Sequence, residues 1–293
     1  MDPHFRPRRS MLYVPGCNRH YLERAKTLHA DSVILDLGDP ILVECKEESR
    51  GNVVEFVNQG GYGSREVVVR VNDLNSPWGS DDIKAVANSK SDAILFPNIE
   101  SKEHVDHALQ ELDQAGGSHL PIMVMIESPI GVLNAKEIAS ASDRIACIVM
   151  ATSDLISQLH ARVTPERSAV LTSLSLVILA ARAYGKAVVD GIASDFKNMH
   201  AFEYACRLGR DMGFDGKSLV HPVQIAYCND AYTPKVTEVE YAIEIIKSLK
   251  AANKSGKGTV VVNDRLVEHH HVRAAERLLK LHEMILELEA KHE

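Results

Sequence analysis

Short apolar runs alternate with amphipathic segments along most of this chain. Eight of these runs are rich in β-branched residues, and they lie within residues 11–15, 32–37, 66–72, 93–97, 121–128, 144–154, 186–190 and 216–222. Continuous apolar runs of this kind are typical of parallel strands that are covered on both faces. The segments between them have apolar positions at helical spacing. The alternation therefore predicts an α/β fold with a parallel sheet.

The number of repeats favours a closed barrel. Eight strand–helix alternations within roughly 235 residues predict a (β/α)8 TIM barrel, whose usual length is about 250 residues. A doubly wound open sheet is the alternative, but no G-x-G-x-x-G motif follows the first strand. The weakest of the eight strands is the last, because only Leu219 and Val220 form its apolar centre. We expect residues 131–142 and 167–184 to form one helix each.

The pattern changes after residue 233. A helix is expected at 236–252, followed by a Lys/Ser/Gly linker at 254–258, a short Val-rich run and a charged helix from about residue 272. This stretch has too few apolar residues for a large core of its own. We therefore expect a barrel at residues 1–233 and a C-terminal helical extension at 234–293, which packs as a lid on the barrel or on a neighbouring subunit.

Composition excludes several classes of partner. The 293 residues carry a net charge of −7 with acids and bases interspersed, which argues against a nucleic-acid or anionic-membrane partner. The five cysteines are far apart and include no C-x-x-C pair, which favours a reducing compartment. No apolar run approaches the roughly 20 residues that a membrane helix needs. We expect a cytoplasmic protein.

The predicted carboxyl ends of the strands carry several acids and one arginine. Glu127 follows the fifth strand and Asp154 the sixth, while Arg70 lies near the end of the third. Because these strand ends meet at one mouth of a barrel, Glu127 and Asp154 are expected to lie close together. Two close carboxylates repel each other unless a cation neutralises them, and oxygen ligands suit Mg²⁺, with Mn²⁺ as an alternative. Arg70 can then hold a substrate carboxylate through two parallel hydrogen bonds.

Each of these residues also has a structural interpretation. Glu127 and Asp154 can cap the helices that follow them, since carboxylates are favoured at helix N-termini. Arg70 can serve as an ion-pair partner of Asp36, which follows the second strand. We interpret His221, after the eighth strand, as a buried imidazole rather than as a catalyst.

Three consecutive histidines follow Glu268. Such a run at 269–271 suggests a metal site or an affinity tag. The run is internal, and it lies at the exposed start of the charged helix. We therefore interpret it as solvated surface.

Eight short motifs occur in order along the chain: Arg9-Ser-Met-Leu-Tyr-Val-Pro-Gly16, Ile34-Leu-Asp-Leu37, Val69-Arg-Val-Asn72, Met125-Ile-Glu-Ser-Pro129, Ser153-Asp-Leu155, Gly213-Phe-Asp-Gly-Lys217, His221-Pro-Val-Gln-Ile225 and Asn263-Asp-Arg-Leu-Val-Glu268. Together they resemble the HpcH/HpaI aldolase family, and more narrowly its citrate lyase beta-subunit-like branch. No single motif decides this, but the ordered set covers nearly the whole chain.

The resemblance implies a (β/α)8 barrel, commonly trimeric, that cleaves a carbon–carbon bond of a β-hydroxyacyl thioester with Mg²⁺. By similarity, Glu127 and Asp154 are the metal ligands, and Arg70 holds the carboxylate of the 2-oxo acid. The C-terminal element of the family supplies an acid to the site of a neighbouring subunit. Glu268 occupies that position here.

Three positions depart from the pattern of the family. Gly38 stands before Asp39 where a glutamate is usual, Asn98 follows Pro97 where a lysine is usual, and Glu268 replaces the usual aspartate. The metal pair and the arginine are retained. This combination favours a working enzyme with a reshaped pocket, in which Pro97 and Asn98 still contribute to substrate binding.

We therefore expect a Mg²⁺-dependent lyase that cleaves a citramalyl-CoA or malyl-CoA type of acyl-CoA into acetyl-CoA and a 2-oxo acid. Glu268 from a neighbouring subunit, Asp39 and a bound water are the alternatives for the catalytic base. The competing hypotheses are the citryl-lyase beta subunit of a citrate lyase complex, a thioesterase acting on the same acyl-CoA, and a non-catalytic protein that binds metal and oxo acid.

Overall fold

The structure is a computed structural model that describes residues 5–254 and 258–291. The chain divides into two compact units, Met1–Tyr232 and Thr233–Glu293, and each is described by itself. No helix between residues 5 and 254 or between 258 and 291 is long and apolar enough to cross a membrane.

The N-terminal unit is a closed barrel of eight parallel strands in sequence order, which confirms the (β/α)8 prediction. The strand that was weakest in the sequence pattern, Gly216–Leu219, is present, and it pairs with the first strand, Ser10–Pro15, to close the barrel. The strands are β1 Ser10–Pro15, β2 Ser32–Asp36, β3 Glu66–Arg70, β4 Ala93–Phe96, β5 Ile122–Ile126, β6 Ile145–Met150, β7 Ala187–Asp190 and β8 Gly216–Leu219.

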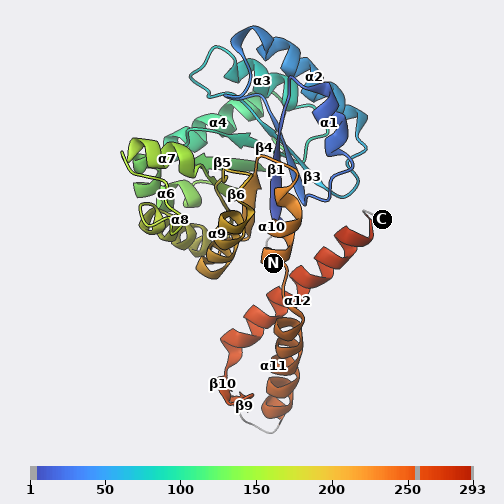
Figure 1. The fold of residues 1–293 in the computed structure, drawn as a ribbon, viewed down its shortest axis with the longest axis vertical. Helices are drawn as coiled ribbons and strands as arrows, with labels where there is room; N and C mark the ends of the chain where they lie inside the picture. The colour runs from blue at the N-terminus through green and yellow to red at the C-terminus, as the bar shows by residue number, and fades with distance from the viewer. Residues whose placement is uncertain (1–4, 255–257, 292–293) are drawn as a thin grey trace. The chain divides into compact units, whose positions relative to one another are not determined.

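Helices follow the strands and cover the outside of the barrel (Figure 1). They are α1 Arg19–Ala25, η1 Val43–Cys45, α2 Lys46–Gln59, α3 Gly79–Val86, α4 Lys102–Gln114, α5 Pro129–Leu133, α6 Ala135–Ser140, α7 Thr152–Gln158, α8 Leu171–Ala183, α9 Met199–Met212 and α10 Gln224–Tyr232. The short helix α7, directly after β6, is not anticipated by the sequence pattern.

The alternating side chains of the strands build two separate cores. Met11, Ile34 and Val68 belong to a small cluster inside the barrel, while Leu12 and Val33 belong to the large cluster that also includes helix residues. Successive side chains of a strand point to opposite faces. Both faces of these strands are therefore apolar, which explains the continuous apolar runs in the sequence.

The prediction of a single helix at residues 131–142 is wrong. The segment forms α5 and α6, which are separated at Asn134. The side chain of Asn134 donates a hydrogen bond from Nδ2 to the carbonyl oxygen of Glu100 at 2.9 Å. This polar contact with the preceding βα loop fixes the bend between the two short helices.

The helix expected from residue 167 begins later, at Leu171. Arg167 has a left-handed backbone, with φ 57°, and its guanidinium group makes two hydrogen bonds to the Asp190 carboxylate at 2.6 and 2.7 Å. Lys217 on β8 donates to the same carboxylate at 2.7 Å. The early part of this segment is therefore shaped by a buried ion triad at the end of β7 rather than by helix formation.

The C-terminal unit contains two helices and a β-hairpin. Its elements are α11 Val236–Lys254, β9 Val260–Val262, β10 Arg265–Val267 and α12 His269–Ala290. The Val-rich run is the first strand of the hairpin, and the turn residues Asn263 and Asp264 both have the positive φ that a two-residue hairpin turn requires. The charged helix begins at His269 rather than near residue 272. Within the linker expected at 254–258, residues 255–257 lie outside the described residues.

Candidate active site

Arg70 is the last residue of β3, and one side of its guanidinium group is anchored. Its Nε donates a hydrogen bond at 2.7 Å to Oδ1 of Asp36, the last residue of β2. The two residues are partners in the β2–β3 register, so both lie at the same end of the barrel. Burial alone lowers the Arg70 pKa, but the charge of Asp36 more than offsets this and the pKa is raised. Arg70 therefore keeps its positive charge in a buried position.

Gly38 lies directly against this guanidinium group. A Cβ atom added at Gly38 would lie 2.6 Å from Nη2 of Arg70 and 2.8 Å from its Cζ. The Gly38 N–H donates to Asp36 Oδ1 at 2.8 Å, and Lys46 Nζ donates to the carbonyl oxygens of Leu37 and Gly38 at 2.9 and 2.7 Å. The missing side chain at position 38 thus gives Arg70 the space that it occupies.

Glu127 follows β5 directly and is buried, with 8% of its surface exposed. Its Oε1 accepts a hydrogen bond from the Asn98 backbone N–H at 2.5 Å, whereas no hydrogen bond or ion pair within residues 5–254 and 258–291 involves its Oε2. Burial is the main cause that raises the Glu127 pKa; the Asn98 N–H lowers it, and the charge of Asp154 raises it further. Glu127 is therefore a carboxylate whose negative charge the neighbouring protein groups do not fully neutralise.

Asp154 lies in the first turn of α7, directly after β6, and its side chain is exposed. It lines a cavity of about 130 Å³ together with Arg70 and Asp36. In the described part of the chain, no hydrogen bond or ion pair involves the Asp154 carboxylate. The structure thus brings an unpaired carboxylate and a fixed cation to one small pocket at the mouth of the barrel.

Neither acid caps its helix through a side-chain hydrogen bond, although Asp154 lies in the first turn of α7, where a carboxylate is favourable. Ser128 is the N-cap of α5, where its side chain accepts a hydrogen bond from the Gly131 N–H, so Glu127 is not needed there. The N-cap of α7 is Ala151, and Asp154 does not make a side-chain capping bond. The ion pair of Arg70 with Asp36 does form, but it uses only one edge of the guanidinium group.

The donors at the barrel mouth fit Mg²⁺. Glu127 Oε2 and the Asp154 carboxylate are oxygen ligands without a protein partner among the described residues, and Mg²⁺ is usually bound through one or two carboxylates with water and substrate oxygens. The charge of Asp154 raises the Glu127 pKa, and a cation between the two groups would remove this repulsion.

Tyr13 on β1 is a pocket residue that the strand pattern alone does not reveal. It lines the same cavity as Arg70, whose Cζ lies 5.5 Å from the centre of the tyrosine ring. Burial raises the Tyr13 pKa, although Arg70 acts in the opposite direction. The phenol therefore stays protonated at neutral pH and can donate a hydrogen bond in the pocket. Its place in the Leu-Tyr-Val-Pro motif at the end of the first strand is the available signal in the sequence.

A second cavity of about 600 Å³ adjoins the first, and Tyr13 and Val220 line both. Its lining is mostly apolar and includes Arg24 and His221. The expectation that His221 is a buried imidazole is wrong, because the residue is exposed and its ring stacks on Phe196 with 4.7 Å between ring centres.

Pro97 and Asn98 form the loop after β4. Pro97 is half-buried, and Asn98 has φ 53°, a left-handed conformation that asparagine tolerates. The Asn98 side chain donates to Asp73 Oδ2 at 2.7 Å, while its backbone N–H holds Glu127. Asn98 therefore orients the glutamate through its backbone and ties two βα loops together through its side chain.

Asp39 and Glu268 differ in their relation to the pocket. Asp39 Oδ2 lies 3.4 Å from Arg70 Nη2, and 94% of the Asp39 side chain is exposed. Glu268 belongs to the C-terminal unit, where it is the N-cap residue of α12. The barrel itself thus brings together Arg70, Asp39, Glu127 and Asp154.

Comparison with known proteins shows the family of the chain. The sequence profile of HpcH/HpaI aldolase/citrate lyase proteins matches residues 9–222, which is most of the chain. The chain belongs to this family. It is 39% identical to a (3S)-malyl-CoA thioesterase of Cereibacter sphaeroides over 279 residues, which are 95% of this chain and 96% of the relative.

Other relatives in the family are subunits of citrate lyase. The chain is 32% identical to the citrate lyase subunit beta of Escherichia coli (strain K12), over 90% of this chain and 89% of the relative. Like these lyases and thioesterases, the chain is a citrate lyase beta-like enzyme. The solved structure of CitE from Mycobacterium tuberculosis, in complex with magnesium, acetoacetate and coenzyme A, matches with a TM-score of 0.76 and 23% identity, over 95% of this chain and 98% of that one. This likeness shows the shared fold.

Proposed function

We propose that this protein is a Mg²⁺-dependent lyase that cleaves a β-hydroxyacyl-CoA of the malyl-CoA or citramalyl-CoA type into acetyl-CoA and a 2-oxo acid. The observation that carries the proposal is the set of two unneutralised carboxylates, Glu127 and Asp154, beside the fixed cation Arg70. Solved relatives support the ligand class, since CitE was determined with magnesium, acetoacetate and coenzyme A, and a citrate lyase beta subunit with oxaloacetate and magnesium.

Arg70 would bind the carboxylate of the oxo-acid part of the substrate. Asp36 takes the Nε side of the guanidinium group, and the contact of Nη2 with Asp39 is long, at 3.4 Å. Within the described residues Nη1 has no hydrogen-bond partner. The edge formed by the two Nη atoms is therefore available for two parallel hydrogen bonds to a planar carboxylate.

Glu127 and Asp154 would hold Mg²⁺ beside this carboxylate. When bound, the ion supplies Lewis-acid polarisation of the substrate hydroxyl and carboxylate oxygens. Asn98 fixes the orientation of Glu127 through the hydrogen bond to Oε1, which leaves Oε2 to face the ion.

The cleavage needs a base for the β-hydroxyl proton. As this proton leaves, the carbon–oxygen bond becomes a carbonyl, and the bond to the α-carbon of the thioester breaks. Its electron pair stays on that carbon, which takes up a proton to give acetyl-CoA. Asp39 at the exposed edge of the pocket, Glu268 of a neighbouring subunit and water are the candidates for the base. Tyr13 is not a candidate, because its raised pKa keeps it protonated.

The larger cavity would hold the CoA part of the substrate. Its apolar lining suits the pantetheine arm, and Arg24 supplies a positive charge for a phosphate group. Because Tyr13 and Val220 line both cavities, the thioester would lie near these two residues.

A thioesterase is the second candidate, favoured by the 39% identity to the (3S)-malyl-CoA thioesterase. Hydrolysis would use the same acyl-CoA but would break the carbon–sulfur bond. Its products are the free hydroxy acid and CoA with a free thiol, whereas the lyase gives an oxo acid and acetyl-CoA. The products therefore separate the two activities.

The deciding experiment incubates the purified full-length chain with malyl-CoA, and separately with citramalyl-CoA, in the presence of Mg²⁺ or of EDTA. Acetyl-CoA and the oxo acid are separated by liquid chromatography, and the free thiol is measured with a thiol reagent. We expect acetyl-CoA with glyoxylate or pyruvate, and loss of this turnover in EDTA that added Mg²⁺ restores.

Other outcomes assign other functions. Free thiol and hydroxy acid without oxo acid would replace the lyase by the thioesterase. Activity that appears only with an acyl-carrier partner would identify a citrate lyase beta subunit. Binding of Mg²⁺ and oxo acid without any turnover would identify a non-catalytic binder.

We also propose that the protein is a cytoplasmic homotrimer. Analytical ultracentrifugation measures the mass of the assembly directly.

A further inference from the structure

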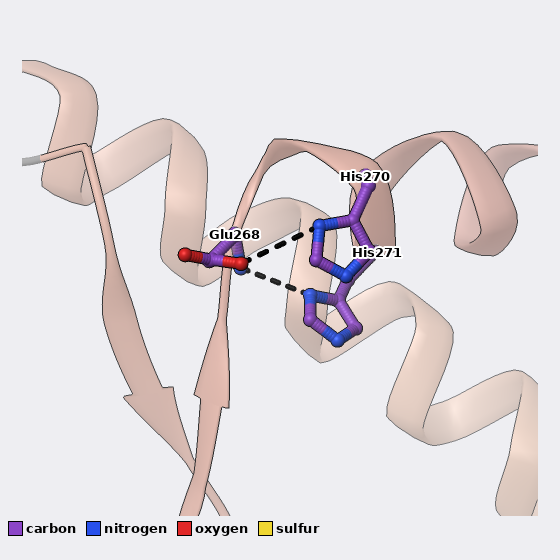
Figure 2. A group of neighbouring side chains, drawn as sticks. All are labelled: Glu268, His270 and His271. Atoms are coloured by element: carbon purple, nitrogen blue, oxygen red, sulfur yellow. Dashed lines mark hydrogen bonds and ion pairs between the residues drawn. The ribbon is translucent and has the colours of Figure 1, made fainter.

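Glu268, His270 and His271 form a compact cluster at the start of α12, in the C-terminal unit (Figure 2). One ligand atom from each residue lies within 4.8 Å of the others. The hairpin of β9 and β10 leads directly into Glu268, and the two histidines are in the first turn of the helix. A rigid turn therefore presents the three side chains together.

Both imidazole rings direct their Nδ1 atoms toward Glu268 (Figure 2). His270 Nδ1 lies 3.5 Å from Glu268 Oε2. His271 Nδ1 accepts a hydrogen bond from the Glu268 backbone N–H at 3.1 Å. An Nδ1 atom that accepts a hydrogen bond carries no proton, so the neutral His271 ring has its proton on Nε2. This is the tautomer that binding of a metal through Nδ1 requires.

One separation within the cluster is close to that of two ligands of a tetrahedral ion. Ligand atoms at about 2.0–2.1 Å from a tetrahedral Zn²⁺ lie about 3.3–3.4 Å apart. The separation of 3.5 Å between His270 Nδ1 and Glu268 Oε2 is already close to this value. Rotation of the partly exposed His271 side chain can bring its Nδ1 to the same distance, in exchange for its hydrogen bond to the Glu268 N–H.

The types of ligand also favour Zn²⁺. The ring centres of His270 and His271 are only 3.8 Å apart, so both imidazoles lie next to each other and beside Glu268. Two neutral imidazoles and one carboxylate are ligands that suit Zn²⁺ better than Mg²⁺.

We propose that Glu268, His270 and His271 bind a divalent transition-metal ion of the Zn²⁺ class, at a site whose three ligands all come from the C-terminal unit. Three protein ligands leave a fourth position of a tetrahedral ion for water or for another oxygen ligand. His269 and His270 are exposed, as expected for solvated surface, and the proposal adds metal binding to this exposed run. It does not depend on the proposed lyase function, because the test measures binding without turnover.

The test titrates Zn²⁺ into the metal-free, full-length chain against a chromophoric chelator, in millimolar Mg²⁺ that occupies the barrel site. The same titration is made with His270→Gln and with His269→Gln. His269 belongs to the same run and is exposed, but it lies outside the cluster, so it is a matched control. Glu127→Gln controls for binding of Zn²⁺ in the barrel.

We expect one Zn²⁺ per chain for the wild-type protein, for His269→Gln and for Glu127→Gln. Loss of a residue that only hydrogen-bonds to a metal ligand lowers metal affinity by about 10–100-fold. His270→Gln removes a ligand itself, so it is expected to lower the Zn²⁺ affinity at least as much. Co²⁺ should give visible absorption bands that His270→Gln removes. Equal affinities of the two histidine variants, loss of binding in Glu127→Gln, or no Zn²⁺ binding by the wild-type chain would each overturn the proposal.

Discussion

The guanidinium group of Arg70 is held at one edge and open at the other, and this division of its donors is specific to arginine. Asp36 takes Nε, and the two terminal nitrogens remain for the substrate. A lysine has a point charge and lacks the planar fork that pairs with a carboxylate through two parallel hydrogen bonds. The residue therefore supplies geometry as well as charge.

Arg70→Lys is accordingly expected to lower kcat/KM for the acyl-CoA by about 100-fold or more. Loss of one preorganised hydrogen-bond donor that stabilises a charged transition state has an effect of this size. Steady-state kinetics with malyl-CoA and citramalyl-CoA measure this change. Arg24→Lys is a useful control, since that residue is proposed to meet only a phosphate. Turnover of Arg70→Lys at the wild-type rate would remove Arg70 from carboxylate binding.

The raised pKa of Glu127 has a consequence for stability. Because the native state holds the Glu127 proton more tightly than the unfolded chain does, stability falls as pH rises through the native pKa. Glu127→Gln removes this ionisation and keeps an oxygen acceptor for the Asn98 N–H. In metal-free buffer we expect the Tm of Glu127→Gln to exceed the wild-type Tm at about pH 8. The difference between the two Tm values should shrink toward about pH 4.

Differential scanning calorimetry at several pH values checks this expectation. Glu137→Gln, at an exposed position of α6, is the control and should show no comparable trend. A wild-type protein that is the more stable of the two at high pH would mean that a cationic group already neutralises Glu127.

Sequence reasoning found the carboxylates at the mouth because their positions directly after apolar strands are visible in the chain. It did not find the contact between Gly38 and Arg70, because this contact joins different strands and depends on a side chain that is absent. Nor does the sequence reveal that Lys46 binds the carbonyl oxygens of the Gly38 loop. Contacts of this kind depend on the barrel register.

At the scale of elements, a buried triad of charges ties β7 and β8 to the segment before α8. Asp190 is fully buried and receives hydrogen bonds from Arg167 and Lys217. Burial alone would raise the Asp190 pKa, but the two cations more than offset this and lower it. The triad therefore contributes stability at neutral pH, and this contribution is lost as pH falls through the lowered native pKa.

Asp190→Asn is expected to reduce the free energy of unfolding by about 3–5 kcal/mol, because it leaves two buried cations without their counter-ion. Urea unfolding followed by circular dichroism measures the loss. Asp106→Ala breaks the exposed pair of Asp106 with Lys102 and should leave the free energy of unfolding nearly unchanged, because surface ion pairs contribute little. Similar values for the two variants would show that the triad is not a major source of stability.

The strands were predictable from the sequence, whereas two of the helix boundaries were not. The eight strands follow from their apolar runs, since both faces of each strand are covered. The break at Asn134 and the late start of α8 were not predictable, because a side-chain bond to a distant loop and an ion pair across the sheet determine them. Tertiary contacts override helical spacing at both places.

At the scale of the whole molecule, the two units have separate hydrophobic cores. The barrel core comprises residues of all eight strands and their helices, while Ala242, Ile245, Val262, Val267 and Ala275 form a small core in the C-terminal unit. A barrel that ends at Tyr232 should therefore fold without the rest of the chain. The role of Glu268 can be tested by removing the unit that carries it.

A chain that stops after Tyr232 is expected to bind Mg²⁺ and a 2-oxo acid with wild-type affinity, measured by calorimetry, but to turn over acyl-CoA slowly. The full-length variant Glu268→Gln, compared with the wild type in Zn²⁺-free buffer, is the matched comparison, and it should be as slow if Glu268 acts as the acid or base. Full turnover by both variants would exclude Glu268 from the chemistry and leave Asp39 or water.

The absence of a side chain at Gly38 also constrains how this enzyme can evolve. Any substitution that adds a side chain at position 38 places its first carbon within 2.8 Å of the arginine that the pocket depends on. A return to the glutamate usual in the family pattern would therefore require the guanidinium group to shift from its place beside Asp36. Such a change adds an acid and moves the cation of the pocket in the same step, so position 38 and the conformation of Arg70 evolve together.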